Sequence, residues 1–368
     1  MLGHSYLLPS AHAAITTTAA ATDAPPDYDD TIKKRISITG CNSGIGFDAA
    51  QRMVVRGHEV VLACRTLDKA IAAADRIKTN IANNAEDAVD ANASLKSLKS
   101  APMECNLADL SSIDAFVKNL TNNKMKKDNN NNNNNAGATP SPLFDAVCYK
   151  AGVACNIDAR DIARTKDGFE LAVGTNHLGY FYLNHLLLSS NLINNNNAGA
   201  GGNAGGAGRI VGLENAIFTK SRQFDMVNGM PFNADKAYKD SKLCNILFVR
   251  ELQRRLDQNM YATSGGSNNI KVNCFTPGLI VGTGLFRDQN QVFTKVFDIA
   301  ATNLLKVGTK NGGLYYFSPP GSSKYGDDAY GKQFGESNVS KEAQESDNNG
   351  KAKRLWELSE KLVGISPM

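Results

Sequence analysis

A glycine-rich turn between a short strand and a helix constrains the fold of this chain more than any other feature. The run TGCNSGIG (39–46) follows the β-branched stretch ISI and precedes a helical pattern that ends at Gly57. Glycines at such a turn let the backbone approach a pyrophosphate, which then lies at the N-terminus of the helix. We therefore predict a dinucleotide site at this turn. Its predicted binding residues are Gly40, Asn42, Ser43, Gly44, Ile45 and Gly46.

Strand-like and helix-like segments alternate along the rest of the chain. After a strand at 36–40 and a helix at 41–57, the pattern predicts strands at 58–65, 101–107, 144–153, 209–214 and 270–278. The helices between them are expected at 66–84, 111–120, 168–188 and 235–256, and Ser111 or Ser112 is the expected N-cap of the second of these four. Strand–helix–strand units are right-handed and make their strands parallel. The sequence thus predicts an α/β fold, a Rossmann-type doubly wound parallel sheet in one domain.

Low-complexity segments set the expected limits of this domain. Residues 1–31 are rich in Ala and Thr and contain neither Arg nor Lys; we interpret them as a disordered leader or the remnant of a targeting segment. The nucleotide-binding domain is expected at 32–317, followed at 318–368 by a C-terminal extension with a terminal helix. Asn- and Gly-rich tracts at 122–142 and 194–208 cannot bury enough apolar surface to order themselves, so we expect surface loops there.

Charge and composition argue against several classes of function. A net charge of +4 over 368 residues is too small to indicate nucleic-acid binding. No apolar run reaches the roughly 18 residues of a membrane-spanning helix, which leaves peripheral membrane association and oligomerisation open. The seven cysteines form no C-x-x-C pair and the five histidines show no ligand spacing, so we expect reduced thiols and no metal.

The end of the second predicted strand bears on the choice of cofactor. Arg65 stands where an acid would bind the ribose hydroxyls of NAD, and Lys69 follows one helical turn later. An arginine there suits the 2′-phosphate of NADPH, although a solvated surface arginine is the alternative. Asn106 and Leu107, after the third strand, are expected to border the adenine, and Pro277 and Gly278, after the sixth, to contact the cofactor.

A tyrosine and a lysine in the segment DKAYKDSKLCNIL (235–247) are candidates for catalysis. Tyr238 and Lys242 are four residues apart, so they share one face of the predicted helix. An ammonium held beside a phenol favours the phenolate and eases proton exchange near neutral pH. A surface Tyr and Lys that merely share a face would show the same spacing.

Three motifs together, TGCNSGIG, TNHLG and AYKDSK, resemble the short-chain dehydrogenase/reductase family over residues 32–285. The resemblance implies that the Tyr transfers a proton, and that the Lys binds the nicotinamide ribose and lowers the pKa of the Tyr. It further implies that an Asn in the preceding helix supports a proton-relay water. The matching residues are Tyr238, Lys242 and Asn176.

Within this family the chain is most similar to the light-dependent protochlorophyllide oxidoreductases. The similarity is carried by DGFELAVGTNHLGYF (167–181), KAYKDSKLCN (236–245), TGLFRD (283–288) and KAKRLWELSEKLVGI (351–365). It implies light-driven reduction of the C17–C18 double bond of protochlorophyllide by NADPH, in a plastid. A tetrapyrrole needs a wide apolar cleft at the carboxyl edge of the sheet.

The chain departs from the subgroup's pattern at four places. Lys150 replaces an Asn after the fourth strand, and Leu279 replaces a cysteine after the sixth. The run from Val211 through Leu213 to Asn215 lacks the usual Ser or Thr, and by alignment Asn215 takes the place of the hydroxyl as a catalytic candidate. The segment 213–238 is also about half the expected length. Two alternatives therefore stay open: a light-independent NADPH carbonyl reductase of the retinol dehydrogenase type, suggested by SKLCNILFVREL (241–252), and a catalytically impaired NADPH- or pigment-binding homologue.

Overall fold

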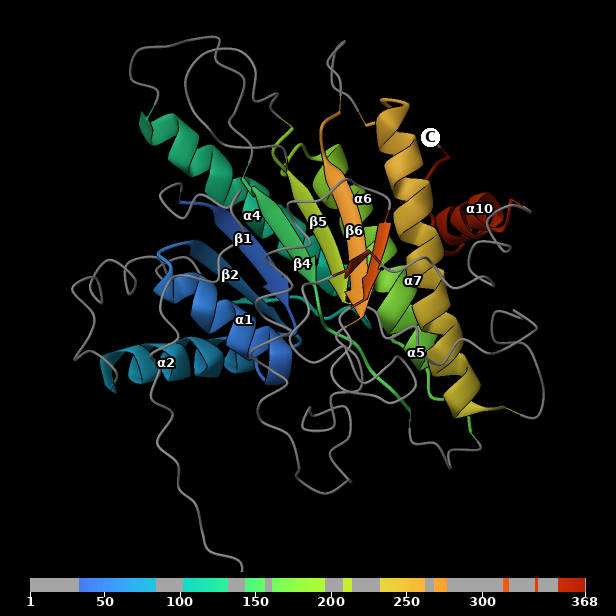
Figure 1. Cartoon of the computed structure of the whole chain (residues 1–368), viewed down its shortest axis with the longest axis horizontal. Helices are drawn as coiled ribbons and strands as arrows, with labels where there is room; N and C mark the ends of the chain where they lie inside the picture. Colours follow the sequence, from blue (N-terminus) through green and yellow to red (C-terminus); the bar gives the residue numbers. More distant parts are fainter. Residues whose placement is uncertain are drawn as a thin grey trace, which may run out of the picture.

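The structure, a computed structural model, describes ten ranges of the chain. These are residues 33–83, 102–131, 143–155, 161–195, 208–213, 232–261, 268–276, 314–317, 335–336 and 350–367. They form an α/β domain with one central sheet (Figure 1). The fold predicted from the alternating pattern is therefore confirmed.

The sheet has the strand order β3-β2-β1-β4-β5-β6-β7-β8. Its strands are β1 (Arg35–Thr39), β2 (Glu59–Cys64), β3 (Pro102–Glu104), β4 (Ala146–Tyr149), β5 (Arg209–Leu213), β6 (Lys271–Thr276), β7 (Leu314–Phe317) and β8 (Gly335–Glu336). All neighbours pair in parallel except β7 and β8. The chain order reverses between β1 and β4, so the carboxyl ends of these two strands flank the crevice where such sheets bind ligands.

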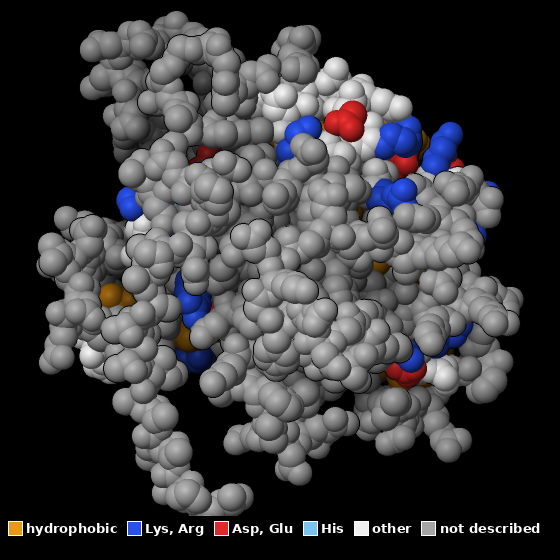
Figure 2. Space-filling view, in the orientation of Figure 1, with side chains coloured by type: hydrophobic (Ala, Val, Ile, Leu, Met, Phe, Trp, Pro, Cys, Tyr) orange, Lys and Arg blue, Asp and Glu red, His pale blue; other side chains and the backbone are white. Residues whose placement is uncertain are grey.

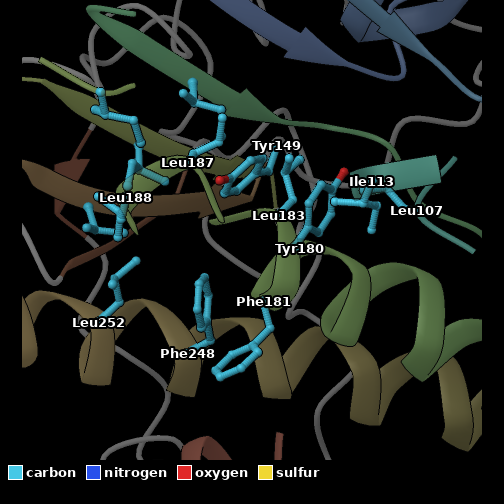
Figure 3. Close-up of a cluster of buried hydrophobic side chains, with 14 of the residues drawn as sticks. Leu107, Ile113, Tyr149, Tyr180, Phe181, Leu183, Leu187, Leu188, Phe248 and Leu252 are labelled. Atoms are coloured by element: carbon cyan, nitrogen blue, oxygen red, sulfur yellow. The ribbon is translucent and has the colours of Figure 1, made fainter. Parts of the chain in front are cut away.

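Helices cover both faces of the sheet, and each face has its own apolar core (Figure 1). One face holds α1 (Gly44–Val55) and α2 (Leu67–Asn83); the other holds α4 (Leu110–Asn131), α6 (Gly179–Ser189) and α7 (Ala234–Asp257). Figure 3 shows the larger core, in which Tyr149 and Tyr180 lie beside Leu183 of α6, and Phe248 of α7 lies near Phe181. Along β2, Val61 faces this core and Leu62 faces the other, which is the two-sided burial expected of a parallel strand.

Three local predictions are corrected by the structure. Ser111 and Ser112 are not the N-cap of α4, because Asp109 Oδ1 accepts their backbone N–H groups at 3.0 and 3.4 Å. The helix then continues to Asn131, through residues where a loop was expected. The single helix predicted at 168–188 is divided into α5 (Leu171–Val173), a π-helical turn η3 (Gly174–Leu178) and α6, and Glu170 caps its start through the N–H groups of Ala172 and Val173.

The terminal helix α10 (Lys351–Val363) packs against α7 and η3 (Figure 1). Trp356 stacks on Phe248 with ring centroids 5.7 Å apart, and the Arg255 guanidinium lies 4.5 Å from the Trp356 ring. Ser359 Oγ lies 2.9 Å from His177 Nε2. Burial lowers the pKa of His177 to about 4, so this ring is neutral at ordinary pH. The C-terminal helix thus completes the core beside the π turn.

Trp356→Ala should lower the free energy of unfolding by about 3–5 kcal/mol, because it removes a fully buried aromatic side chain. Leu358→Ala on the same helix changes a side chain that is 41% exposed and should cost less than about 0.5 kcal/mol. Denaturant titration of both variants checks this. Equal midpoints for the two would show that α10 does not depend on this contact.

Within the described ranges, no helix has the length and apolar character that crossing a membrane requires. No cluster of three or more metal-ligating side chains occurs among these residues, and the seven cysteines are free thiols. Figure 2 shows basic and acidic side chains intermixed on the described part of one face. That mixture matches the small net charge and offers no extended basic surface there.

Candidate active site

The glycine turn has the backbone geometry that a phosphate cradle needs. Gly40 and Gly44 have φ angles of +66° and +56°, which disfavour other residues. A Cβ on Gly40 would lie 2.7 Å from Ala151 Cα, and one on Gly46 would lie 2.5 Å from the Gly40 carbonyl oxygen. Only glycine fits at either position. The turn therefore leaves its backbone uncovered by side chains at these glycines.

Helix α1 begins directly after this turn with its N-terminus available to an anion. The N-cap Ser43 makes no side-chain capping bond, and the first turn contains no acidic residue. The dipole and the free N–H groups of such a helix end favour a negative charge. Ile45 is buried and the Asn42 carbonyl accepts a bond from Arg76 at 3.3 Å, so the predicted turn residues also hold the turn in place.

Thr39, which the sequence analysis did not select, joins the turn to β4. Its Oγ1 accepts the N–H groups of Lys150 and Ala151 at 3.0 and 3.2 Å and lies 3.0 Å from Tyr180 Oη. Tyr180 Oη in turn donates to the Ala151 carbonyl oxygen. These contacts fix the end of β4 against the end of β1.

Tyr238 and Lys242 lie on α7 as predicted, one turn apart, with the Lys242 Nζ 5.7 Å from the centre of the Tyr238 ring. Lys242 is buried and Tyr238 is half-buried. The neighbouring Lys236 and Lys239 instead form ion pairs with Asp240 and Asp235 on the same helix. The spacing therefore directs Lys242 inward, and it brings a cation beside the phenol.

Asn176 is fully buried in the π turn η3, and its amide connects this turn to the loop after β4 and to α7. Its Oδ1 accepts the N–H of Val153 at 2.8 Å, and its Nδ2 donates to the Val153 carbonyl at 2.8 Å and to Ser241 Oγ at 3.0 Å. Ser241 Oγ donates to the Tyr238 carbonyl at 2.6 Å. A Cβ added to Gly152 would lie 3.2 Å from Asn176 Oδ1 and 3.5 Å from Lys242 Nζ. The structure thus brings Asn176, Lys242 and Tyr238 together at the carboxyl edge of the sheet.

A sequence model of the short chain dehydrogenase family matches residues 34–292, which include the turn, the π turn and α7. The chain belongs to the short-chain dehydrogenase family. Curated relatives of the chain are distant in sequence but align with nearly its whole length. A chloroplastic protochlorophyllide reductase of Cucumis sativus is 28% identical, over 97% of this chain and 84% of that protein. The corresponding protein of Pisum sativum is 29% identical with the same coverage.

Two solved structures superpose on the chain. An uncharacterized protein from Mycobacterium Paratuberculosis gives a TM-score of 0.56 at 24% identity, covering 93% of this chain and 98% of that one. A short chain dehydrogenase from Escherichia coli CFT073, solved in complex with NADPH, gives 0.52 at 16% identity, with coverage of 80% and 100%. These likenesses support the fold alone.

Three residues are predicted to lie near the adenine end of the cofactor, and their side chains differ in exposure. Arg65 is exposed and follows β2 directly. Asn106 is half-buried and its Oδ1 accepts the N–H of Ala108 at 3.2 Å, within the turn after β3. The Leu107 side chain is buried in the larger core (Figure 3), and its carbonyl packs against Gly179. Of these three residues, only Arg65 has an exposed side chain.

Several predicted residues lie outside the described part of the chain. These are Asn215, Pro277, Gly278 and the substituted Leu279, whereas Leu213 is described only as the last residue of β5. Lys150, the departure from the family pattern at the end of β4, is described and half-buried. The resulting site combines a phosphate cradle, a phenol with a neighbouring cation, and a fixed amide. It can hold an anionic dinucleotide and exchange a proton.

Proposed function

We propose that this protein is an NADPH-dependent oxidoreductase that reduces the C17–C18 double bond of protochlorophyllide to chlorophyllide in a light-driven reaction, in a plastid. The observation that carries the proposal is the similarity to chloroplastic protochlorophyllide reductases over 97% of the chain. The grouping of Tyr238, Lys242 and Asn176 at the ligand-binding edge of the sheet supports it. The substrate is then a tetrapyrrole, a large and mostly apolar molecule.

The residues of the chain supply binding, orientation and a proton. When bound, NADPH supplies the hydride. Tyr238 donates the proton from its hydroxyl, and the Lys242 ammonium stabilises the phenolate that remains. Asn176 holds the backbone of Val153 and, through Ser241, that of Tyr238, so the phenol keeps its place while it gives up the proton. By alignment Asn215 takes the place of the family's hydroxyl residue, and we propose that its amide hydrogen-bonds to the substrate.

Arg65 gives the site its preference for NADPH in this proposal. Its guanidinium is suited to the 2′-phosphate, a group that NADH lacks. Arg65→Ala should weaken NADPH binding by about 1–3 kcal/mol and leave NADH binding nearly unchanged. Titration of each cofactor against wild type and variant measures both values. Equal losses for the two cofactors would remove Arg65 from cofactor selection.

Substrate specificity is tested by adding protochlorophyllide and NADPH to the purified protein in the dark. We expect a bound pigment with a red-shifted absorption band, which illumination converts to the chlorophyllide spectrum. Dark oxidation of NADPH by a retinal-like aldehyde would instead assign the site to a carbonyl reductase; the short 213–238 segment favours that alternative. Pigment binding without conversion would indicate an impaired homologue, in line with the Lys150 and Leu279 replacements.

A further inference from the structure

Lys150 is held directly against the glycine turn by its backbone. It follows β4 at the point where the strand order reverses, and its N–H donates to Thr39 Oγ1 at 3.0 Å. The next residue, Ala151, packs closely against Gly40. A Cβ added to Gly40 would lie only 2.7 Å from the Ala151 Cα. The position of Lys150 relative to the phosphate cradle is therefore fixed by the fold.

The side chain of Lys150 continues along the same turn. Its Cδ would lie 2.9 Å from a Cβ built on Gly46, in the first turn of α1. The ammonium beyond this atom interacts electrostatically with the Cys41 thiol of the turn and with the Lys242 ammonium of α7. The stem of Lys150 thus lies in the space that Gly46 leaves open, next to the glycine turn.

No described group neutralises this charge. Among the described residues no carboxylate forms an ion pair with Lys150, and the first turn of α1 contains no acid. Lys242 has the same sign, and the α1 N-terminus adds a further positive potential. A lysine ammonium beside a helix N-terminus favours an anion at this turn.

We infer that Lys150 is a binding residue for the pyrophosphate of the dinucleotide. This inference rests on the proposed use of NADPH and adds a cation that the family's pattern does not contain. Arg65 lies at the end of β2 and serves the 2′-phosphate, whereas Lys150 lies at the turn itself. The group it binds is therefore one that NADPH and NADH share, so the two cations make separable contributions.

The charge of Lys150 couples cofactor binding to pH. Burial, with a contribution from Lys242, lowers the pKa of Lys150 to about 8, and Cys41 opposes the shift. A bound pyrophosphate raises this pKa, so the contribution of Lys150 to affinity is complete below pH 8 and is lost as the pH rises above it. At pH 8 the protein should take up roughly half a proton when a dinucleotide binds.

The test compares Lys150→Met, Lys150→Arg and the control Lys118→Met, which removes an exposed lysine of α4. Calorimetric titrations with NADPH and with NADH at pH 8, in two buffers of different ionisation enthalpy, give both affinity and proton uptake. NADH has no 2′-phosphate, so its proton uptake reports on the protein. Lys150→Met should weaken both cofactors equally, by about 10- to 100-fold, and abolish the uptake with NADH.

Lys150→Arg should retain most of the affinity without proton uptake, because a guanidinium stays charged at pH 8. Lys118→Met should match wild type in both measurements. Unchanged affinity in Lys150→Met, or a loss confined to NADPH, would overturn the assignment to the pyrophosphate. If the wild-type protein bound neither cofactor, both the proposed function and the role of Lys150 would be wrong. If wild type and Lys150→Met bound both cofactors with equal affinity, only the role of Lys150 would be wrong.

Discussion

Tyr238→Phe should lower the rate of substrate reduction by about 10²- to 10⁴-fold, because the variant lacks the hydroxyl that donates the proton. The ring and its position above Lys242 are retained, so the affinity for NADPH should stay within about twofold of wild type. The measurements are chlorophyllide formed per absorbed photon and a titration with NADPH. Loss of turnover with unchanged cofactor binding is the pattern expected of a proton donor.

Tyr182→Phe is the matched control for this variant. Tyr182 donates its hydroxyl to Asp114 Oδ1 at 2.9 Å, between α6 and α4 and apart from α7. The Tyr182→Phe variant also loses a phenolic oxygen, but outside the site, so its turnover should equal that of wild type. A Tyr238→Phe protein with full turnover would exclude Tyr238 as the proton donor, whatever the control did.

Asn176→Ala should affect both stability and turnover. The substitution removes three hydrogen bonds and leaves the Val153 backbone groups without their partner, which should lower the free energy of unfolding by about 2–3 kcal/mol. Turnover should fall by about 100-fold, since the loop after β4 and the α7 backbone lose their common support. Denaturant titration and the light-driven assay measure the two effects.

Two variants separate this role from general damage. Ser241→Ala removes the bond from Asn176 to α7 and the Ser241 bond to the Tyr238 carbonyl, but it leaves both bonds to Val153, and it should cost about 1 kcal/mol of stability. Asn119→Ala, on the exposed side of α4, should change neither property. Wild-type stability and turnover in Asn176→Ala would show that the π turn does not organise the site.

Local patterns in the sequence predict the parts of the fold that depend on neighbours in the chain. The glycine turn follows from the conformations that Gly40 and Gly44 alone adopt easily, and the pairing of Tyr238 with Lys242 follows from helical spacing. The parallel sheet follows from alternation, because a strand–helix–strand unit has one common handedness. These features need no knowledge of distant contacts.

The features that sequence reasoning missed depend on contacts between distant segments. The π turn at Asn176 forms where its amide meets the backbone of Val153, and the role of Thr39 exists only because β4 ends beside it. Asp109 replaces the expected serine cap because its carboxylate reaches both N–H groups. For Lys150, the sequence indicates a substituted position but not the direction of the side chain along Gly46.

The most direct test of the central claim is the absorption spectrum of the protein with NADPH and protochlorophyllide before and after a single flash of light. The account predicts a bound-pigment band that falls as a chlorophyllide band rises, only when NADPH is present and only after the flash. A bound pigment whose spectrum is unchanged by light, in protein shown to bind NADPH, would contradict it.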